Sequence, residues 1–113
     1  MPRASGALVS LPTASRRALV KLGHDIATAR RRRRIPQRLM AERMLVSLQS
    51  LQRLEAGDPS VGISILVSAL FILGMTARLE ALIEPENDAV GLGEELSRLP
   101  KRTRAPAEPD LDF

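Results

Sequence analysis

Apolar residues in this chain recur mainly at three- and four-residue spacing, the periodicity of amphipathic helices. The first repeat predicts a helix over residues 16–33, and two shorter repeats predict helices over residues 36–44 and 48–56. Pro36 at a first helical turn costs no hydrogen bond, and Ser47 is a typical N-cap. The pattern therefore predicts an all-α fold.

The helix over residues 48–56 carries its apolar and polar side chains on opposite faces. At about 100° of rotation per residue, Leu51 and Leu54 lie together and must be buried. The opposite side holds Gln49, Gln52 and Arg53. Because Gln can form two hydrogen bonds with adenine and Arg two with guanine, this face suits the base edges of DNA. The alternative is an ordinary solvated face without a ligand.

A short turn joins the helices over residues 36–44 and 48–56, which is the layout of a helix-turn-helix head that reads DNA. Gln37 lies at the amino end of the first of these helices, where backbone amides and the helix dipole favour a phosphate oxygen. We interpret Gln37 as a clamp on the DNA backbone. The preceding run, Arg30–Arg34, ends a helix. We expect at least two of Arg31 to Arg34 to contact phosphate, with solvated charge as the alternative.

Residues 59–77 contain no charge, so a membrane span has to be weighed against a buried helix. The dense apolar part covers residues 61–75, about 22 Å at 1.5 Å per residue, against ~30 Å of hydrocarbon in a bilayer. Glycine, serine and threonine residues dilute it further. We therefore expect a buried helix that ends at Gly74, and no membrane partner.

This helix is apolar on nearly every side, and one stripe of it is expected in the core: Leu66, Ala69, Leu70 and Leu73. A small domain cannot also bury the remaining apolar residues, so a homodimer is expected to cover them. They comprise Ile65, Phe71 and Ile72, together with Leu79, Leu82 and Ile83 of a short helix that begins at Thr76. A symmetric dimer would place two reading helices ~34 Å apart, which matches a palindromic operator one DNA turn long.

Four segments are expected along the chain. They are a flexible arm over residues 1–15, a DNA-binding and dimerisation domain over residues 16–83, a linker with a weak helix over residues 84–99, and a disordered tail over residues 100–113. The tail has prolines, mixed charge and few apolar residues, a composition that cannot form a core. Phe113 at its end is either a docking anchor or a residue without a role.

Charge is segregated along the chain. Residues 1–57 hold twelve Lys or Arg and three acids, whereas residues 58–113 hold five and ten. A basic half attracts nucleic acid without regard to sequence. Two Phe and no Tyr or Trp argue against the stacking surfaces that bind single strands or RNA, which favours double-stranded DNA.

The chemistry of an enzyme is missing from the sequence. Cysteine is absent, so no thiol nucleophile and no thiolate metal site is possible. His24 is the single histidine. No glycine-rich phosphate loop and no convincing carboxylate pair occurs. We expect no catalysis, no metal and no cofactor, and a cytoplasmic, nucleoid-associated protein.

From Leu22 to about Leu82 the sequence resembles the Xre family of Cro-type, lambda-repressor-like DNA-binding domains. The residues that carry the resemblance are Arg30, Gln37, Met40, Ala41, Val46, Ser47, Leu51, Leu54, Glu55, Gly57, Leu66, Leu73 and Gly74. The resemblance implies a compact five-helix domain, here with a short extra C-terminal helix and a tail.

The resemblance also implies roles for single residues. A phosphate contact falls on Gln37, and the base-reading positions fall on Leu48, Gln49, Ser50, Gln52 and Arg53. Leu48 departs from the usual polar type and is expected to touch a thymine methyl group. A structural ion pair would join Arg30 to Glu55, and Ala41 is the small residue where two helices cross. Arg34 and Leu45 stand where the family often has glycine, and left-handed backbone there would cost roughly 1 kcal/mol each.

The small size, hydrophobic dimer region and C-terminal segment are most similar to HipB-type antitoxins, which repress their own operon and bind a HipA-like kinase toxin. A phage-type or stand-alone Xre regulator without a toxin is the first alternative. A second alternative, from another class, is a protein-interaction subunit whose apolar helix binds a partner and which reads no DNA.

Overall fold

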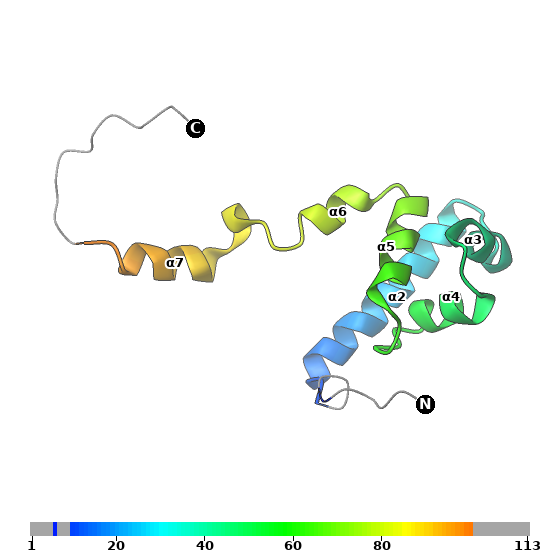
Figure 1. The fold of residues 1–113 in the computed structure, drawn as a ribbon, viewed down its shortest axis with the longest axis horizontal. Coiled ribbons are helices and arrows are strands. Elements are labelled where there is room, and N and C mark those ends of the chain that lie inside the picture. The colour runs from blue at the N-terminus through cyan, green and yellow to red at the C-terminus, as the bar shows by residue number, and fades with distance from the viewer. Residues whose placement is uncertain (1–5, 7–9, 101–113) are drawn as a thin grey trace. The chain divides into compact units, whose positions relative to one another are not determined.

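A computed structural model of the chain describes residue 6 and residues 10–100. The described residues form helices and turns, with no strand among them, which confirms the prediction of an all-α fold (Figure 1). The chain divides between Glu80 and Ala81 into two units. Residues 13–15 of the predicted flexible arm belong to a helix, while residues 1–5 and 7–9 of that arm lie outside the described residues, as does the predicted tail after Pro100, including Phe113.

Five helices lie in the described residues of the first unit, namely α2 (Thr13–Arg32), α3 (Gln37–Met44), α4 (Leu48–Glu55), α5 (Ile63–Ile72) and α6 (Thr76–Glu80). The second unit contains the 3-10 helix η1 (Pro85–Asn87) and α7 (Ala89–Ser97). Helix α2 begins three residues earlier than the sequence pattern indicated, directly after the extended backbone of Pro12. Helix α6 ends before Leu82 and Ile83, which were expected inside it.

A serine cap begins α4, and glycines with positive φ follow α4 and α5. The Ser47 side chain accepts a hydrogen bond of 3.0 Å from the backbone amide of Ser50 at the start of α4. Gly57 after α4 and Gly74 after α5 have φ angles of 78° and 74°, a region that glycine enters without steric cost. The chain therefore turns sharply after both helices, and α5 packs against α3 and α4.

The core of the first unit lies between α2, α3, α4 and α5 (Figure 1). Helix α4 packs against α2, α3 and α5, and α3 also packs against α5. The buried apolar side chains are Ile26, Ala27, Met40, Ala41, Met44, Leu51, Leu54, Ala69 and Leu73. Full burial of one large apolar side chain contributes about 1.5–3 kcal/mol. A core of this size is therefore sufficient only for a small unit.

Helix α5 faces the core with a wider surface than the predicted stripe. Ala69 and Leu73 are buried as expected, but Ile65 and Ile72, which were assigned to a dimer interface, lie half-buried against the core. Both α3 and α4 pack on α5, so its contact surface extends beyond one stripe. Packing within one chain therefore accounts for the burial of these two isoleucines.

Three of the four other residues assigned to a dimer interface are exposed. Phe71 is 72% exposed, Leu82 70% and Ile83 86%, whereas Leu79 is half-buried.

In the part of the chain that the structure describes, no helix combines the length and the hydropathy required to cross a membrane.

Candidate nucleic-acid interface

The turn between α3 and α4 contains a left-handed residue. Leu45 has φ 58° and ψ 40°, and its amide donates to the carbonyl of Glu42 at 3.1 Å. The amide of Val46 donates to the carbonyl of Ala41 at 3.1 Å. These bonds satisfy carbonyls that the end of a helix leaves unpaired. The second residue that stands in place of a glycine, Arg34, is also left-handed, with φ 54°.

Helices α2 and α4 approach each other to backbone contact at Gly23. A Cβ atom placed there would lie 2.6 Å from the carbonyl oxygens of both Leu54 and Glu55. Gly23 was not among the residues predicted from the sequence, although an isolated glycine inside a helical repeat can mark a close packing contact. Ala41, the expected small residue at a helix crossing, is buried with 3% of its surface exposed.

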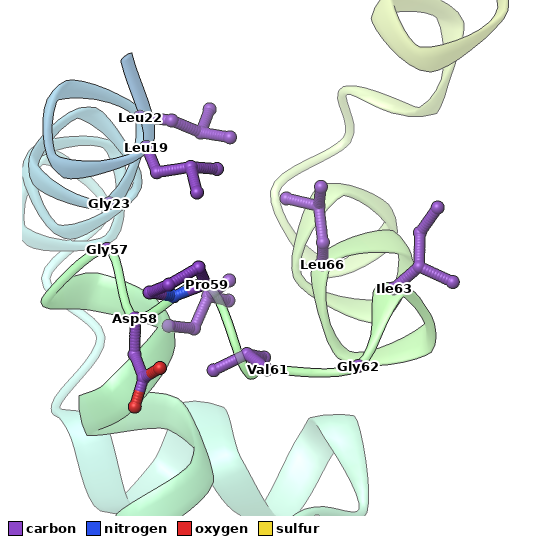
Figure 2. Close-up of a pocket in the computed structure, with 11 residues that line it drawn as sticks. Leu19, Leu22, Gly23, Gly57, Asp58, Pro59, Val61, Gly62, Ile63 and Leu66 are labelled. Carbon is purple, nitrogen blue, oxygen red and sulfur yellow. The ribbon is translucent and has the colours of Figure 1, made fainter. Parts of the chain in front are cut away.

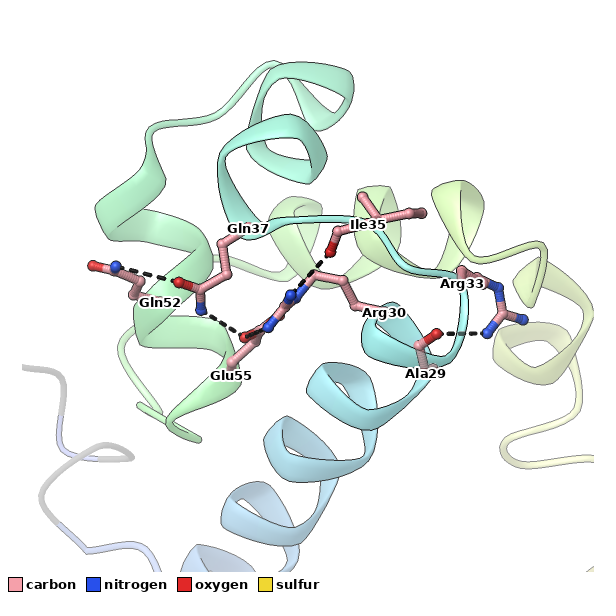
Figure 3. A network of polar contacts seen from close by, with 7 residues as sticks. All are labelled: Ala29, Arg30, Arg33, Ile35, Gln37, Gln52 and Glu55. Carbon is pink, nitrogen blue, oxygen red and sulfur yellow. Dashed lines mark hydrogen bonds and ion pairs between the residues drawn. The ribbon is translucent and has the colours of Figure 1, made fainter.

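A buried ion pair holds the end of α2 to the end of α4. Arg30 donates from Nε to Glu55 Oε2 at 2.7 Å and from Nη2 to Glu55 Oε1 at 3.0 Å (Figure 3). Only 7% of the Arg30 side chain and 6% of the Glu55 side chain are exposed. Nη1 of Arg30 donates to the carbonyl of Ile35 at 3.0 Å. The structure thus places together the two residues that the family resemblance paired.

Gln37, the predicted phosphate clamp, belongs to the same hydrogen-bond network. Its Nε2 donates to Glu55 Oε1 at 2.8 Å, and its Oε1 accepts from Gln52 Nε2 at 3.4 Å (Figure 3). Gln37 is half-buried and Gln52 is exposed. The network therefore runs from the buried ion pair to a predicted base-reading side chain, a connection that the sequence did not reveal.

The other predicted base-reading residues differ in their environments. Gln49 is exposed on α4, and Leu48 is half-buried. Ser50 is half-buried, and its hydroxyl oxygen accepts from the Ser47 hydroxyl at 2.9 Å. Of these residues, Gln49 is the one whose side chain makes no hydrogen bond within the described residues and is also well exposed.

Arg53 is held beside the loop that follows α4. Its Nε donates to Asp58 Oδ2 at 3.0 Å, and a second guanidinium nitrogen donates to the Ser60 hydroxyl. Hydrogen bonds from Ser60, and then the bond from Arg53, lower the pKa of Asp58 from 3.8 to about 2. Asp58 is therefore a carboxylate at neutral pH, and it holds one edge of the Arg53 guanidinium, whose Nη1 hydrogens remain without a partner in the described residues. The sequence reasoning did not identify Asp58.

The members of the arginine run, Arg30–Arg34, differ in the hydrogen bonds that their side chains make. Arg33 donates to the carbonyl of Ala29 at 2.8 Å (Figure 3) and to the carbonyl of Leu73, at the end of α5, at 3.0 Å. Together with the buried Arg30, it serves the fold. Residues 31–34 are all exposed, but the side chains of Arg31, Arg32 and Arg34 form no hydrogen bond or ion pair within the part of the chain that the structure describes.

A small apolar pocket of about 160 Å³ lies between α2 and α5 (Figure 2). Leu19, Leu22 and Leu66 point into it, and Asp58 is the single ionisable residue of its lining. The Asp58 carboxylate points away from these leucines, toward its partners Arg53 and Ser60. The pocket therefore brings together no pair of groups able to exchange protons with a bound molecule.

The predicted base-reading residues thus lie on α4, which the core and the Arg30–Glu55 pair hold in place.

The chain matches no protein-family model, no curated protein and no solved structure.

Proposed function

We propose that this protein is a sequence-specific, double-stranded-DNA-binding transcriptional repressor with a lambda-repressor-like helix-turn-helix domain. The observation that carries the proposal is the placement of Gln49, Gln52 and Arg53 on the solvent-facing side of α4, opposite the buried Leu51 and Leu54. An α-helix fits the major groove of B-DNA, and glutamine and arginine side chains read adenine and guanine there.

The charges around this helix support the proposal. Arg31 and Arg32 lie in the last turn of α2, Arg34 follows that helix, and Arg38 and Arg43 lie on α3; all five are exposed. Such side chains supply a salt-dependent attraction to phosphate that positions the protein without reading sequence. Leu48, at the start of α4, would contact a thymine methyl group.

Operator recognition by two copies forms part of the proposal. The exposed Phe71, Leu82 and Ile83 are the apolar residues that a second copy would cover. Two subunits related by a twofold axis would bind the two halves of a palindromic operator.

The direct test measures binding to the duplex upstream of the coding sequence by fluorescence anisotropy at physiological salt, with a random duplex as competitor. Gln49→Ala, Gln52→Ala and Arg53→Ala should each lower the preference for the specific duplex by about 5- to 100-fold. Arg78→Ala is the charge-matched control, because it removes one exposed arginine from α6, away from α4. A parent protein that binds both duplexes equally would contradict the proposal.

The second unit supports a narrower form of the proposal, an autoregulating antitoxin with a HipA-like kinase toxin as its partner. Beyond the residues assigned to the dimer, its apolar side chains lie open to solvent, namely Val90, Leu92, Leu96 and Leu99. Exposed apolar residues in such number are typical of a protein-binding segment. Co-purification with the product of the neighbouring gene tests this form. Intact repression without any partner would favour a stand-alone regulator.

A further inference from the structure

The hydrogen-bond network from Glu55 to Gln52 has a fixed direction. The Glu55 carboxylate, paired with the Arg30 guanidinium, can only accept hydrogen bonds. Gln37 must therefore turn its amide nitrogen toward Glu55, which it contacts at 2.8 Å. An amide has its nitrogen and its oxygen on opposite sides, so the Gln37 oxygen faces Gln52.

The same reasoning fixes the orientation of Gln52. Because the Gln37 oxygen can only accept, Gln52 turns its amide nitrogen toward Gln37, at 3.4 Å. The carbonyl oxygen of Gln52 then points away from the network (Figure 3). Gln52 is exposed, so this oxygen and the second amide hydrogen are available to a ligand.

We propose that this network makes Gln52 select adenine over guanine at one base pair, with Gln37 and Glu55 as positioning residues. The inference rests on the proposed DNA-binding function. In the major groove adenine presents an amino donor beside the N7 acceptor, which matches a glutamine that offers an oxygen and one hydrogen. Guanine presents two acceptors, and its O6 would face the Gln52 oxygen. A glutamine whose amide nitrogen was free could donate one hydrogen to N7 and one to O6 of guanine, whereas Gln52 already gives one of its two hydrogens to Gln37.

The test begins with selection of binding sites by the full-length protein from a duplex pool with a randomised 20-base-pair segment. Gln52→Met identifies the base pair that Gln52 reads, because the preference at that position is lost. The parent should prefer adenine over guanine there by roughly 5- to 150-fold. Gln37→Met should reduce the preference at the same position to within about threefold and leave the other positions unchanged.

Gln49→Met is the matched control, since Gln49 is an exposed glutamine on α4 outside the network. It should alter a different position, and its effect should not depend on Gln37. A second readout uses purine in place of adenine at the Gln52 position, because purine lacks the exocyclic amino group. That replacement should weaken binding by the parent but not by Gln52→Met.

The outcomes separate this inference from the proposed function. If the parent selects a sequence but Gln37→Met keeps the full preference, or if the Gln52 position prefers guanine, the network does not orient Gln52 and the inference fails alone. If the parent enriches no sequence, the proposed function and the inference fail together. Should Gln37→Met not fold, the choice between adenine and guanine and the purine replacement still decide the inference.

Discussion

Replacement of Glu55 by leucine is expected to destabilise the first unit strongly. The change removes two hydrogen bonds that the carboxylate accepts from Arg30, at 2.7 and 3.0 Å, and one from Gln37. The guanidinium of Arg30 would remain buried, with its single bond to the carbonyl of Ile35. A charge in that position has lost its water and its counter-charge together.

The size of the effect follows from this burial. Removal of one partner of a buried ion pair typically costs about 3–5 kcal/mol, whereas replacement of both partners by apolar residues is often close to neutral. A domain of this size has a total free energy of unfolding of about 5–15 kcal/mol. We therefore expect Glu55→Leu to cost about 3–5 kcal/mol and the double variant Arg30→Met/Glu55→Leu to recover most of that loss.

Urea unfolding at 25 °C, followed by circular dichroism, measures these differences. The control is Lys21→Met, which removes one partner of an ion pair with Asp25 whose side chains are 78% and 53% exposed. It should leave the unfolding midpoint unchanged, because water screens such a pair. A loss below about 1 kcal/mol for Glu55→Leu, or a double variant less stable than the single one, would refute the reasoning.

Four further outcomes are expected. Leu45→Gly should raise the free energy of unfolding by about 0.5–1 kcal/mol in urea titrations, since φ 58° strains a leucine but not a glycine. Gly23→Ala should lower it by about 1–3 kcal/mol, because the new Cβ would lie 2.6 Å from two carbonyl oxygens; an unchanged midpoint would contradict this contact. The pKa of Asp58 in the folded protein, about 2, lies below the ordinary 3.8. The carboxylate therefore stabilises the folded state above pH ~4, and this stabilisation is lost as the pH falls toward 2. The acid unfolding midpoint of Asp58→Asn should shift accordingly to higher pH. In DNA titrations against salt, Arg32→Ala should reduce the slope of log K by about 0.9, whereas Arg33→Ala should lower stability and leave the slope unchanged.

The elements of the first unit were predictable because local signals agree with packing. The cap at Ser47, the buried Leu51 and Leu54, and the buried Ala69 and Leu73 all follow from spacing and residue type. The left-handed backbone of Arg34 and Leu45 agrees with the resemblance, since the resembled family often has glycine at these two positions. A resemblance, and not the periodicity, suggested the pair of Arg30 and Glu55, which are 25 residues apart.

The contacts that the sequence did not reveal depend on how helices cross. Gly23 becomes critical only because the end of α4 lies directly against its backbone. Asp58 can hold Arg53 because Gly57 turns the chain back toward α4, with φ 78°. The burial of Ile65 and Ile72 requires both α3 and α4 to pack on α5, which the repeat within a single helix does not encode.

The arginine run shows why composition alone overstates the charge available to DNA. In the sequence, Arg30 to Arg34 are five equivalent cations. In the fold, Arg30 is neutralised by a buried carboxylate, and Arg33 donates to the ends of α2 and α5. Both side chains hold helix ends together through bonds that a phosphate would have to replace. If the protein binds DNA as proposed, the run would contribute at most ~3 to the salt dependence per chain, at about 0.9 per neutralised phosphate, in place of the ~4.5 that five free arginines would give.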